Sequence, residues 1–254
     1  MKNILKVKNA CKYFGDLKAV DKLNFEVEEN IIFGVAGPNG AGKTTMFNII
    51  TGIPFQPTSG EILFQDENIT NLPGHKICHM GIARTFQREA IFKSLTVLEN
   101  VELGWVYGQS KSKNNNSICT SVIDALELVG IEKEIYHKNA SHLPLFDQKK
   151  LMLASAIATN PKILFLDEPA SGLNHSEIDE TIDLIRNIND KGVTIVVIEH
   201  ILSLLVKLAD KLMILNEGKK LIEDQPEKVM NDDRVIEVYL GGGSKNAQKN
   251  LRDK

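Results

Sequence analysis

Cysteine is scarce in this chain: three residues, Cys11, Cys78 and Cys119, lie far apart among 254 and form no CxxC pair. An odd, scattered set is typical of a reduced cytosolic protein and excludes a disulfide framework. Long apolar runs are also missing, because charged side chains interrupt even Ile201–Leu215, and a membrane helix needs roughly 20 apolar residues. The opening Met1–Lys6 holds no apolar stretch that would serve as a signal peptide. We therefore expect any association with a membrane to occur by docking.

An excess of positive charge is absent as well. The formal net charge is -3 and the isoelectric point is about 6.1, so composition gives no sign of a nucleic-acid partner. Hydrophobic residues make up 43% and charged residues 25% of the chain, which is the balance of a globular protein with a buried core.

Short apolar runs alternate with polar or glycine-rich segments and helical patterns. This alternation predicts an α/β fold with a parallel sheet whose strands carry ligands at their carboxyl ends. Two runs near the N-terminus, one of them alternating apolar with polar residues, predict an antiparallel β-subdomain. The expected parallel strands are Ile31–Ala36, Ile163–Leu166 and Val193–Ile198, the N-terminal ones are Leu5–Ala10 and Leu23–Glu28, and Glu61–Phe64 and Lys211–Leu215 are further candidates.

The middle third of the chain has a helical character. Its apolar spacing predicts helices over Thr96–Val106, Val122–Val129 and Gln148–Thr159, while Gly108–Ser117 is polar enough to be a loop. We expect one domain over residues 1–240 with a helical subdomain inserted at about 88–160. Residues 241–254 combine three glycines with charged and amide side chains, which predicts a flexible tail.

A glycine-rich segment, Gly37–Thr44, matches the pattern GxxxxGK[ST] between the Ile31–Ala36 strand and a predicted helix over Lys43–Ile50. Glycines allow the backbone to wrap around phosphate oxygens, and a helix N-terminus favours anions at the same place. Lys43 would add a full positive charge and the Thr44 hydroxyl would bind Mg²⁺. A fortuitous glycine turn is the alternative, but the strand and helix on either side favour a nucleotide site. The expected nucleotide-binding residues of this segment are Gly37, Pro38, Asn39, Gly40, Ala41, Gly42, Lys43, Thr44 and Thr45.

Two acids follow the apolar strand Ile163–Leu166. Asp167 is placed to bind Mg²⁺, and Glu168 is placed to polarise the water that attacks the γ-phosphate of ATP. Acids at the end of a strand often only cap the next turn. The phosphate-binding segment in the same chain favours the catalytic interpretation.

With these two motifs placed, the chain resembles the ABC ATPases over nearly its full length. Three further positions match family motifs, and their roles are implied by that resemblance alone. Phe14 matches a ring that stacks on adenine, Gln87 matches the Q-loop glutamine that contacts metal and water, and His200 matches the switch histidine at the γ-phosphate. Ser171–Asn174 matches the D-loop, which crosses to a second subunit.

The resemblance narrows to the ATPases of branched-chain amino acid importers, a group close to urea and short-amide importers. It is carried by Asn68–Phe86, Leu95–Asn100 and the ending Val238–Gly241, and it implies the substrate class only by analogy. In this group two ATPase chains pair on the cytoplasmic face of the membrane beneath two permease chains, and an external solute-binding protein supplies them. We expect a heterodimeric ATPase pair, with a homodimer as the alternative.

One segment departs from the family. Where the signature LSGGQ is typical, this chain reads LPLFDQ over Leu143–Gln148. Pro144 replaces the serine and so lacks its hydroxyl. Phe146 replaces the second glycine, and its ring should obstruct the approach to the γ-phosphate of the partner's ATP. We therefore hypothesise one active and one weak site in the pair; the alternative is a backbone shift that leaves both active.

Three alternatives are weighed, and the last of them is excluded. Another ABC transporter branch, such as the lipopolysaccharide-export ATPases, has similar sequences. A nucleotide-binding regulatory module with little hydrolysis would explain the altered signature, although Glu168 and His200 argue against it. The DNA-repair and chromosome ABC ATPases need long coiled-coil insertions, for which this chain has no room.

Overall fold

The computed structural model describes residues 2–86, 90–108 and 118–240. The chain forms two compact units. The first unit consists of Met1–Gly74 and Thr194–Lys254, and the second is the intervening His75–Val193. The predicted single domain with an insertion at about 88–160 stays a prediction, and the predicted tail lies outside the described residues.

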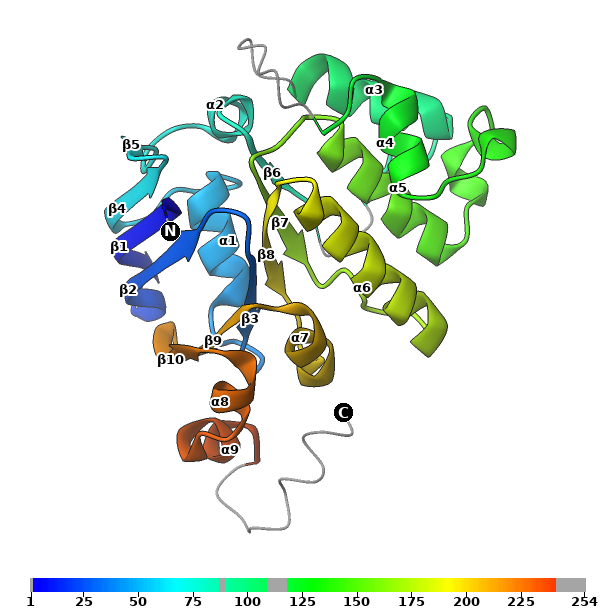
Figure 1. Ribbon diagram of the computed structural model, residues 1–254. Coiled ribbons are helices and arrows are strands. Elements are labelled where there is room, and N and C mark those ends of the chain that lie inside the picture. Colours follow the sequence, from blue (N-terminus) through cyan, green and yellow to red (C-terminus); the bar gives the residue numbers. More distant parts are fainter. Residues whose placement is uncertain (1, 87–89, 109–117, 241–254) are drawn as a thin grey trace. The chain divides into compact units, whose positions relative to one another are not determined.

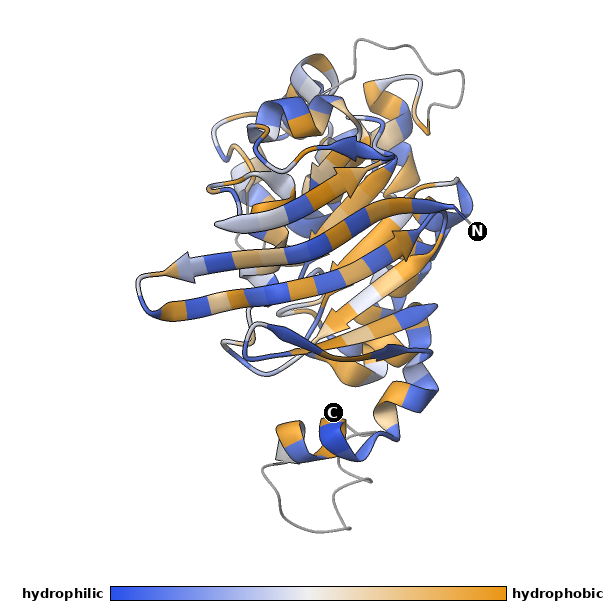
Figure 2. Cartoon of the chain, turned by 90° about the vertical axis from the view of Figure 1, so that its left-hand side faces the viewer, coloured by the Kyte–Doolittle hydropathy of each residue, from blue (hydrophilic) through white to orange (hydrophobic). Residues whose placement is uncertain are grey.

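An antiparallel sheet opens the first unit, with the strand order β2-β1-β4-β5. Buried and exposed residues alternate along much of its long hairpin, as a sheet with one solvated face requires, and Figure 2 shows hydrophobic and hydrophilic residues alternating along the two strands of this hairpin. The strands are β1 (Asn3–Phe14), β2 (Leu17–Glu28), β4 (Ser59–Phe64) and β5 (Glu67–Asn68).

A second sheet of the first unit holds the buried core strand β3 (Ile32–Ala36). β3 pairs in parallel with both β8 (Thr194–Ile198) and β9 (Lys211–Asn216), and β10 (Lys219–Asp224) pairs with β9 in the antiparallel direction. All five residues of β3 are buried, which explains its continuous apolar sequence. The helices of this unit are α1 (Lys43–Thr51), α7 (Leu202–Leu208), α8 (Pro226–Met230) and α9 (Asp233–Leu240).

The second unit contains a parallel strand pair and a group of helices. β6 (Ile82–Arg84) lies beside β7 (Ile163–Asp167), with Arg84 opposite Phe165. Helices α3, α4 and α5 gather into one group (Figure 1). The helices are α3 (Val97–Gly108), α4 (Val122–Leu128), α5 (Leu145–Ile157) and α6 (His175–Asp190), with 3₁₀ turns at Lys133–Ile135 and Ala140–His142; α2 (Gly74–His79) spans the junction of the two units.

The structure confirms the α/β class, the parallel core strands and the N-terminal antiparallel sheet. Several predicted bounds were wrong. The hairpin strands are longer than expected, α3 runs on to Gly108, and α5 begins at Leu145 instead of Gln148. The rest of the predicted polar loop, residues 109–117, lies outside the described part of the chain. Within the residues that the structure describes, every helix is too short or too polar to cross a bilayer.

Candidate nucleotide-binding site

The glycine-rich segment between β3 and α1 has the backbone of a phosphate-binding loop. Gly37, Gly40 and Gly42 have φ angles of 153°, 80° and 99°, a region that L side chains rarely adopt. Two of them also lie against neighbouring backbone. A Cβ atom on Gly37 would lie 2.1 Å from the carbonyl oxygen of Leu215, and one on Gly42 would lie 2.3 Å from that of Ala19. Glycine is therefore required at both positions.

Two other parts of the first unit hold this loop in place. The Gly218 amide, in the turn between β9 and β10, donates to the Ala41 carbonyl at 3.0 Å. The Asp21 amide of β2 in turn donates to the Gly218 carbonyl at 2.9 Å. The loop is thus fixed by strands that precede and follow it in the sequence, which pre-organises its backbone N–H groups.

Helix α1 presents an uncapped N-terminus to the loop. Its N-cap is Gly42, whose lack of a side chain leaves the first turn without a side-chain cap, and the first turn contains no acid. The N–H groups at such a helix end attract an anion. The Lys43 ammonium donates to the carbonyls of Gly37 and Pro38 at 2.6 and 3.0 Å, and the Thr44 side chain is exposed. Backbone N–H groups, an ammonium and a hydroxyl therefore converge here.

His200 lies at the same edge of this sheet as the loop. β3 and β8 are parallel and register Val35 opposite Ile198, so their carboxyl ends lead into the loop and into His200 respectively. The imidazole is 53% exposed, with its Nδ1 3.8 Å from Oε2 of the buried Glu199. The structure thus brings together two motifs that the sequence separates by more than 150 residues.

Phe14 ends β1 at the tip of the long hairpin and is 44% exposed. Its ring meets that of Phe55 edge to face, with centroids 5.2 Å apart, and the Lys12 ammonium lies over both rings. Ala19, which contacts the phosphate loop, follows shortly after on β2. An exposed ring at the tip of a hairpin whose second strand reaches the loop at Ala19 is suited to stacking on a base.

In the second unit, β7 delivers the two acids at its carboxyl end. The Asp167 carboxylate is buried and accepts a hydrogen bond from the Arg84 guanidinium, with Nη2 and Oδ2 2.8 Å apart. Glu168 adopts a left-handed backbone with φ of 50°, a strained conformation of the kind that clusters at functional sites. The Lys149 ammonium of α5 donates to the Glu168 carbonyl oxygen at 3.3 Å, so the strained residue is tied to the signature helix.

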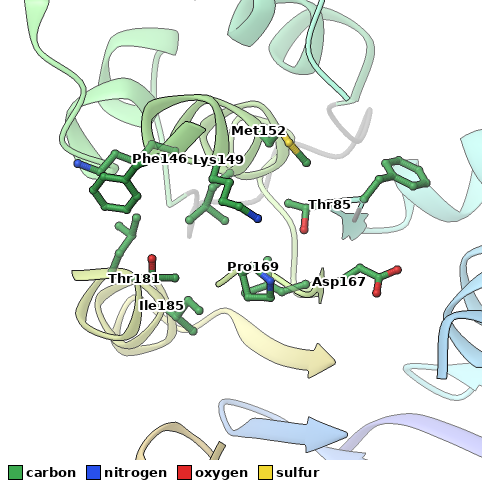
Figure 3. Close-up of a pocket in the computed structure, with 13 residues that line it drawn as sticks. Thr85, Phe146, Lys149, Met152, Asp167, Pro169, Thr181 and Ile185 are labelled. Atoms are coloured by element: carbon green, nitrogen blue, oxygen red, sulfur yellow. The ribbon is translucent and has the colours of Figure 1, made fainter. Parts of the chain in front are cut away.

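The altered signature, Leu143–Gln148, begins two residues before α5 and continues into its first turn. Pro144 is the N-cap and provides no side-chain cap. The Phe146 ring lies under the Lys150 ammonium, 4.2 Å from its centroid, and lines a mainly apolar cavity together with Thr181 of α6. Figure 3 shows Phe146 and Thr181 at one end of this cavity and Asp167 and Thr85 at the other. The ring therefore packs within the second unit.

The sequence-predicted residues fall into three sets. The first unit holds Phe14, Gly37–Thr45 and His200, and the second holds Asp167 and Glu168. The predicted Gln87 lies outside the described residues. The donors Thr44 and Asp167 are a hydroxyl and a carboxylate, the latter paired with Arg84, and oxygen ligands of this kind fit Mg²⁺. Sequence reasoning missed the contacts of Arg84 and Lys149, which no local pattern reveals.

The comparisons agree with this geometry. The ABC transporter family model matches residues 20–171. The high-affinity branched-chain amino acid transport ATP-binding protein LivG of Escherichia coli K12 is 38% identical over 251 residues, covering 94% of this chain and 98% of the relative. The protein BraF of Pseudomonas aeruginosa, with the same description, is 37% identical over 254 residues and covers 94% and 98%.

Solved structures give the same result. A nucleotide-free ATP-binding cassette from an ABC transporter superposes with a TM-score of 0.85 at 29% identity, covering 94% of this chain and 100% of that one. A structure of the ADP conformation of an ATP-binding cassette of an ABC transporter gives a TM-score of 0.85 at 30% identity, covering 95% of this chain and 100% of that one. Because the family model spans more than half of the chain and relatives span nearly all of it, the chain belongs to the ABC transporter family and is one of its ATPases.

Proposed function

We propose that this chain hydrolyses ATP to drive the import of branched-chain amino acids or similar small solutes through a membrane permease. The observation that carries the proposal is the phosphate loop, in which strained glycines, the uncapped end of α1 and the Lys43 ammonium meet. The substrate class is supported by relatives named for branched-chain amino acid transport that match 94% of the chain.

In the proposed reaction, water attacks the γ-phosphorus of ATP while the bond from that phosphorus to the bridging oxygen breaks, giving ADP and phosphate. The loop amides and Lys43 bind the phosphates, and Phe14 stacks on the base. The Glu168 carboxylate orients the water and takes up its proton, while His200 contacts the γ-phosphate. Thr44, Asp167 and Gln87 would hold Mg²⁺, which when bound neutralises phosphate charge.

Two substitutions test these roles. Lys43→Ala should weaken nucleotide binding as well as turnover, because it removes a charge that the phosphates contact in every state. Glu168→Gln should preserve binding and lower the hydrolysis rate by roughly 10²–10⁴-fold, the usual contribution of a positioned base. Binding is measured with a fluorescent ATP analogue and turnover by phosphate release. Normal turnover with glutamine at position 168 would remove Glu168 from the mechanism.

We further propose that the chain pairs with a second ABC ATPase chain at the cytoplasmic face of the membrane, beneath permease subunits that receive solute from an external binding protein. In that pair the site served by this chain's signature is weak, because Pro144 supplies no hydroxyl and Phe146 supplies a ring in place of the family glycine. The site served by this chain's own phosphate loop stays active. A heterodimer with an intact signature on its partner follows from this asymmetry.

Because Phe146 packs into its own unit, the alternative in which both sites of the pair are active also fits the structure. One assay separates the asymmetric pair from this symmetric one. ATP hydrolysis by the purified chain and by Phe146→Gly is measured over a range of protein concentrations. If wild type is nearly inactive and the glycine variant gains concentration-dependent activity, the ring disables the site. If wild type is active and glycine adds nothing, the asymmetric pair is wrong. Inactivity of both, with normal nucleotide binding, would favour a regulatory module.

A further inference from the structure

Arg84 is brought to the acids of β7 by strand pairing. It is the last residue of β6, which runs parallel to β7, and it stands opposite Phe165. The Thr85 amide then donates to the Phe165 carbonyl at 2.9 Å, which extends the pairing by one step. The Arg84 side chain therefore starts from a strand that is hydrogen-bonded to β7. Its register partner, Phe165, lies two residues before Asp167 on β7.

The Arg84–Asp167 contact is a buried ion pair. The two side chains are 5% and 1% exposed, and Nη2 lies 2.8 Å from Oδ2. The guanidinium carbon also lies 5.0 Å from the centre of the Phe86 ring, an aromatic face that favours a cation. Burial lowers the pKa of Arg84, but a guanidinium keeps its charge in proteins. Arg84 is thus a fixed counter-ion to a carboxylate that water scarcely reaches.

We propose that Arg84 is a positioning residue that orients the Asp167 carboxylate and opposes the binding of Mg²⁺ to it. The inference rests on the proposed function of Asp167 as a magnesium ligand. Arg84 engages Oδ2 and so fixes the plane of the carboxylate. Its positive charge repels a divalent cation that approaches the same group, and this repulsion is strong where water is excluded.

This arrangement has a functional consequence. A buried carboxylate without a counter-ion would be costly in the nucleotide-free chain. With Arg84 in place the acid is already compensated, so the metal alone gains little by binding. Nucleotide phosphates supply the further negative charge that offsets the repulsion. Arg84 therefore makes metal binding depend on the nucleotide.

The test is a titration of Mg²⁺ into the full chain saturated with a fluorescent non-hydrolysable ATP analogue, at one fixed pH for all variants. Compared with wild type, Arg84→Gln should lower the half-saturating Mg²⁺ concentration by about tenfold. Arg84→Lys keeps the positive charge but loses the planar pair of guanidinium donors. Its half-saturating Mg²⁺ concentration should lie between those of wild type and Arg84→Gln. Arg186→Gln removes an exposed arginine of α6 in the same unit and should leave the titration unchanged. Asp167→Asn should lose most of the Mg²⁺ response.

The outcomes separate the two proposals. If Asp167→Asn loses the response but Arg84→Gln leaves the half-saturating concentration unchanged or raises it, the inference about Arg84 is wrong and the proposed function stands. If Asp167→Asn responds like wild type, Asp167 is not a metal ligand and both fail. Should Arg84→Gln not fold, the ¹⁵N signal of the Arg84 Nε in wild type decides: adding Mg²⁺ to the nucleotide-bound chain should shift it, and no shift would overturn the inference.

Discussion

Gly40 and Gly42 of the phosphate loop form a matched pair for testing why the loop needs glycine. Both have positive φ angles, 80° and 99°, so alanine at either position meets the same backbone strain of about 1–2 kcal/mol. Only at Gly42 would a side chain also collide with neighbouring backbone atoms. A Cβ atom there would lie 2.3 Å from the Ala19 carbonyl oxygen and 3.4 Å from the Gly218 Cα, whereas a Cβ atom on Gly40 meets nothing within 4 Å.

The steric conflict at Gly42 involves backbone, which cannot turn aside like a flexible side chain. Overpacking of this kind costs about 1–3 kcal/mol in addition to the strain. Gly42→Ala should therefore lower the free energy of unfolding by about 2–5 kcal/mol, and Gly40→Ala by about 1–2 kcal/mol. The substitution at position 42 should also weaken nucleotide binding at least tenfold, because β2 and the β9–β10 turn must move away from the loop.

The assay is equilibrium unfolding in urea without nucleotide, followed by circular dichroism, with nucleotide binding measured on the same preparations. Equal loss of stability in the two variants would refute the steric argument and leave only the shared backbone strain. A stable Gly42→Ala chain with normal nucleotide affinity would contradict the assignment of the contact with Ala19.

Two further predictions concern other parts of the chain. Asn174 caps α6 by accepting from the Glu177 amide in a capping box, so Asn174→Ala should cost about 1 kcal/mol in thermal or urea unfolding; a loss below a few tenths would show that the cap contributes nothing. Tyr13 donates a hydrogen bond to the Asp21 carboxylate at 2.8 Å and thereby lowers the pKa of Asp21. Because the pKa is lower in the folded chain, this hydrogen bond contributes its full stability above the ordinary pKa of 3.8. The contribution is lost as the pH falls through the lowered pKa of the folded state. Tyr13→Phe should therefore destabilise the chain at pH 7 and progressively less in acid, and a pH-independent loss would contradict this.

The sequence predicted best those elements whose residues carry the signal themselves. β3 is a continuous apolar run, and the Gly37–Thr44 pattern defines the loop and the start of α1, so all three were found. β6 was missed because three residues show no periodicity. The start of α5 was placed too late, at Gln148, whereas the helix begins at Leu145 and already includes Phe146.

Contacts between distant segments lay beyond the reach of sequence reasoning. Arg84 and Asp167 are separated by 83 positions, and their pairing follows from the parallel register of β6 and β7. The same holds for Lys149, whose partner is a backbone carbonyl that any residue would provide. The roles of Asp167 and Glu168 were inferred from residue type and position. Only the structure shows that Arg84 is the counter-ion of Asp167 and that Lys149 donates a hydrogen bond to the Glu168 carbonyl.

The hydrogen bonds that hold the phosphate loop in place link the binding of a ligand to the folding stability of the first unit. The Ala41–Gly218 and Gly218–Asp21 hydrogen bonds tie the loop to β2 and to the β9–β10 turn, so a ligand that fixes the loop also opposes the opening of these strands. A ligand at one hundred times its dissociation constant adds about 2.7 kcal/mol to the stability of the state that binds it. The Gly218 amide, which no phosphate needs to touch, should then exchange its hydrogen with solvent up to about one hundredfold more slowly when nucleotide is present.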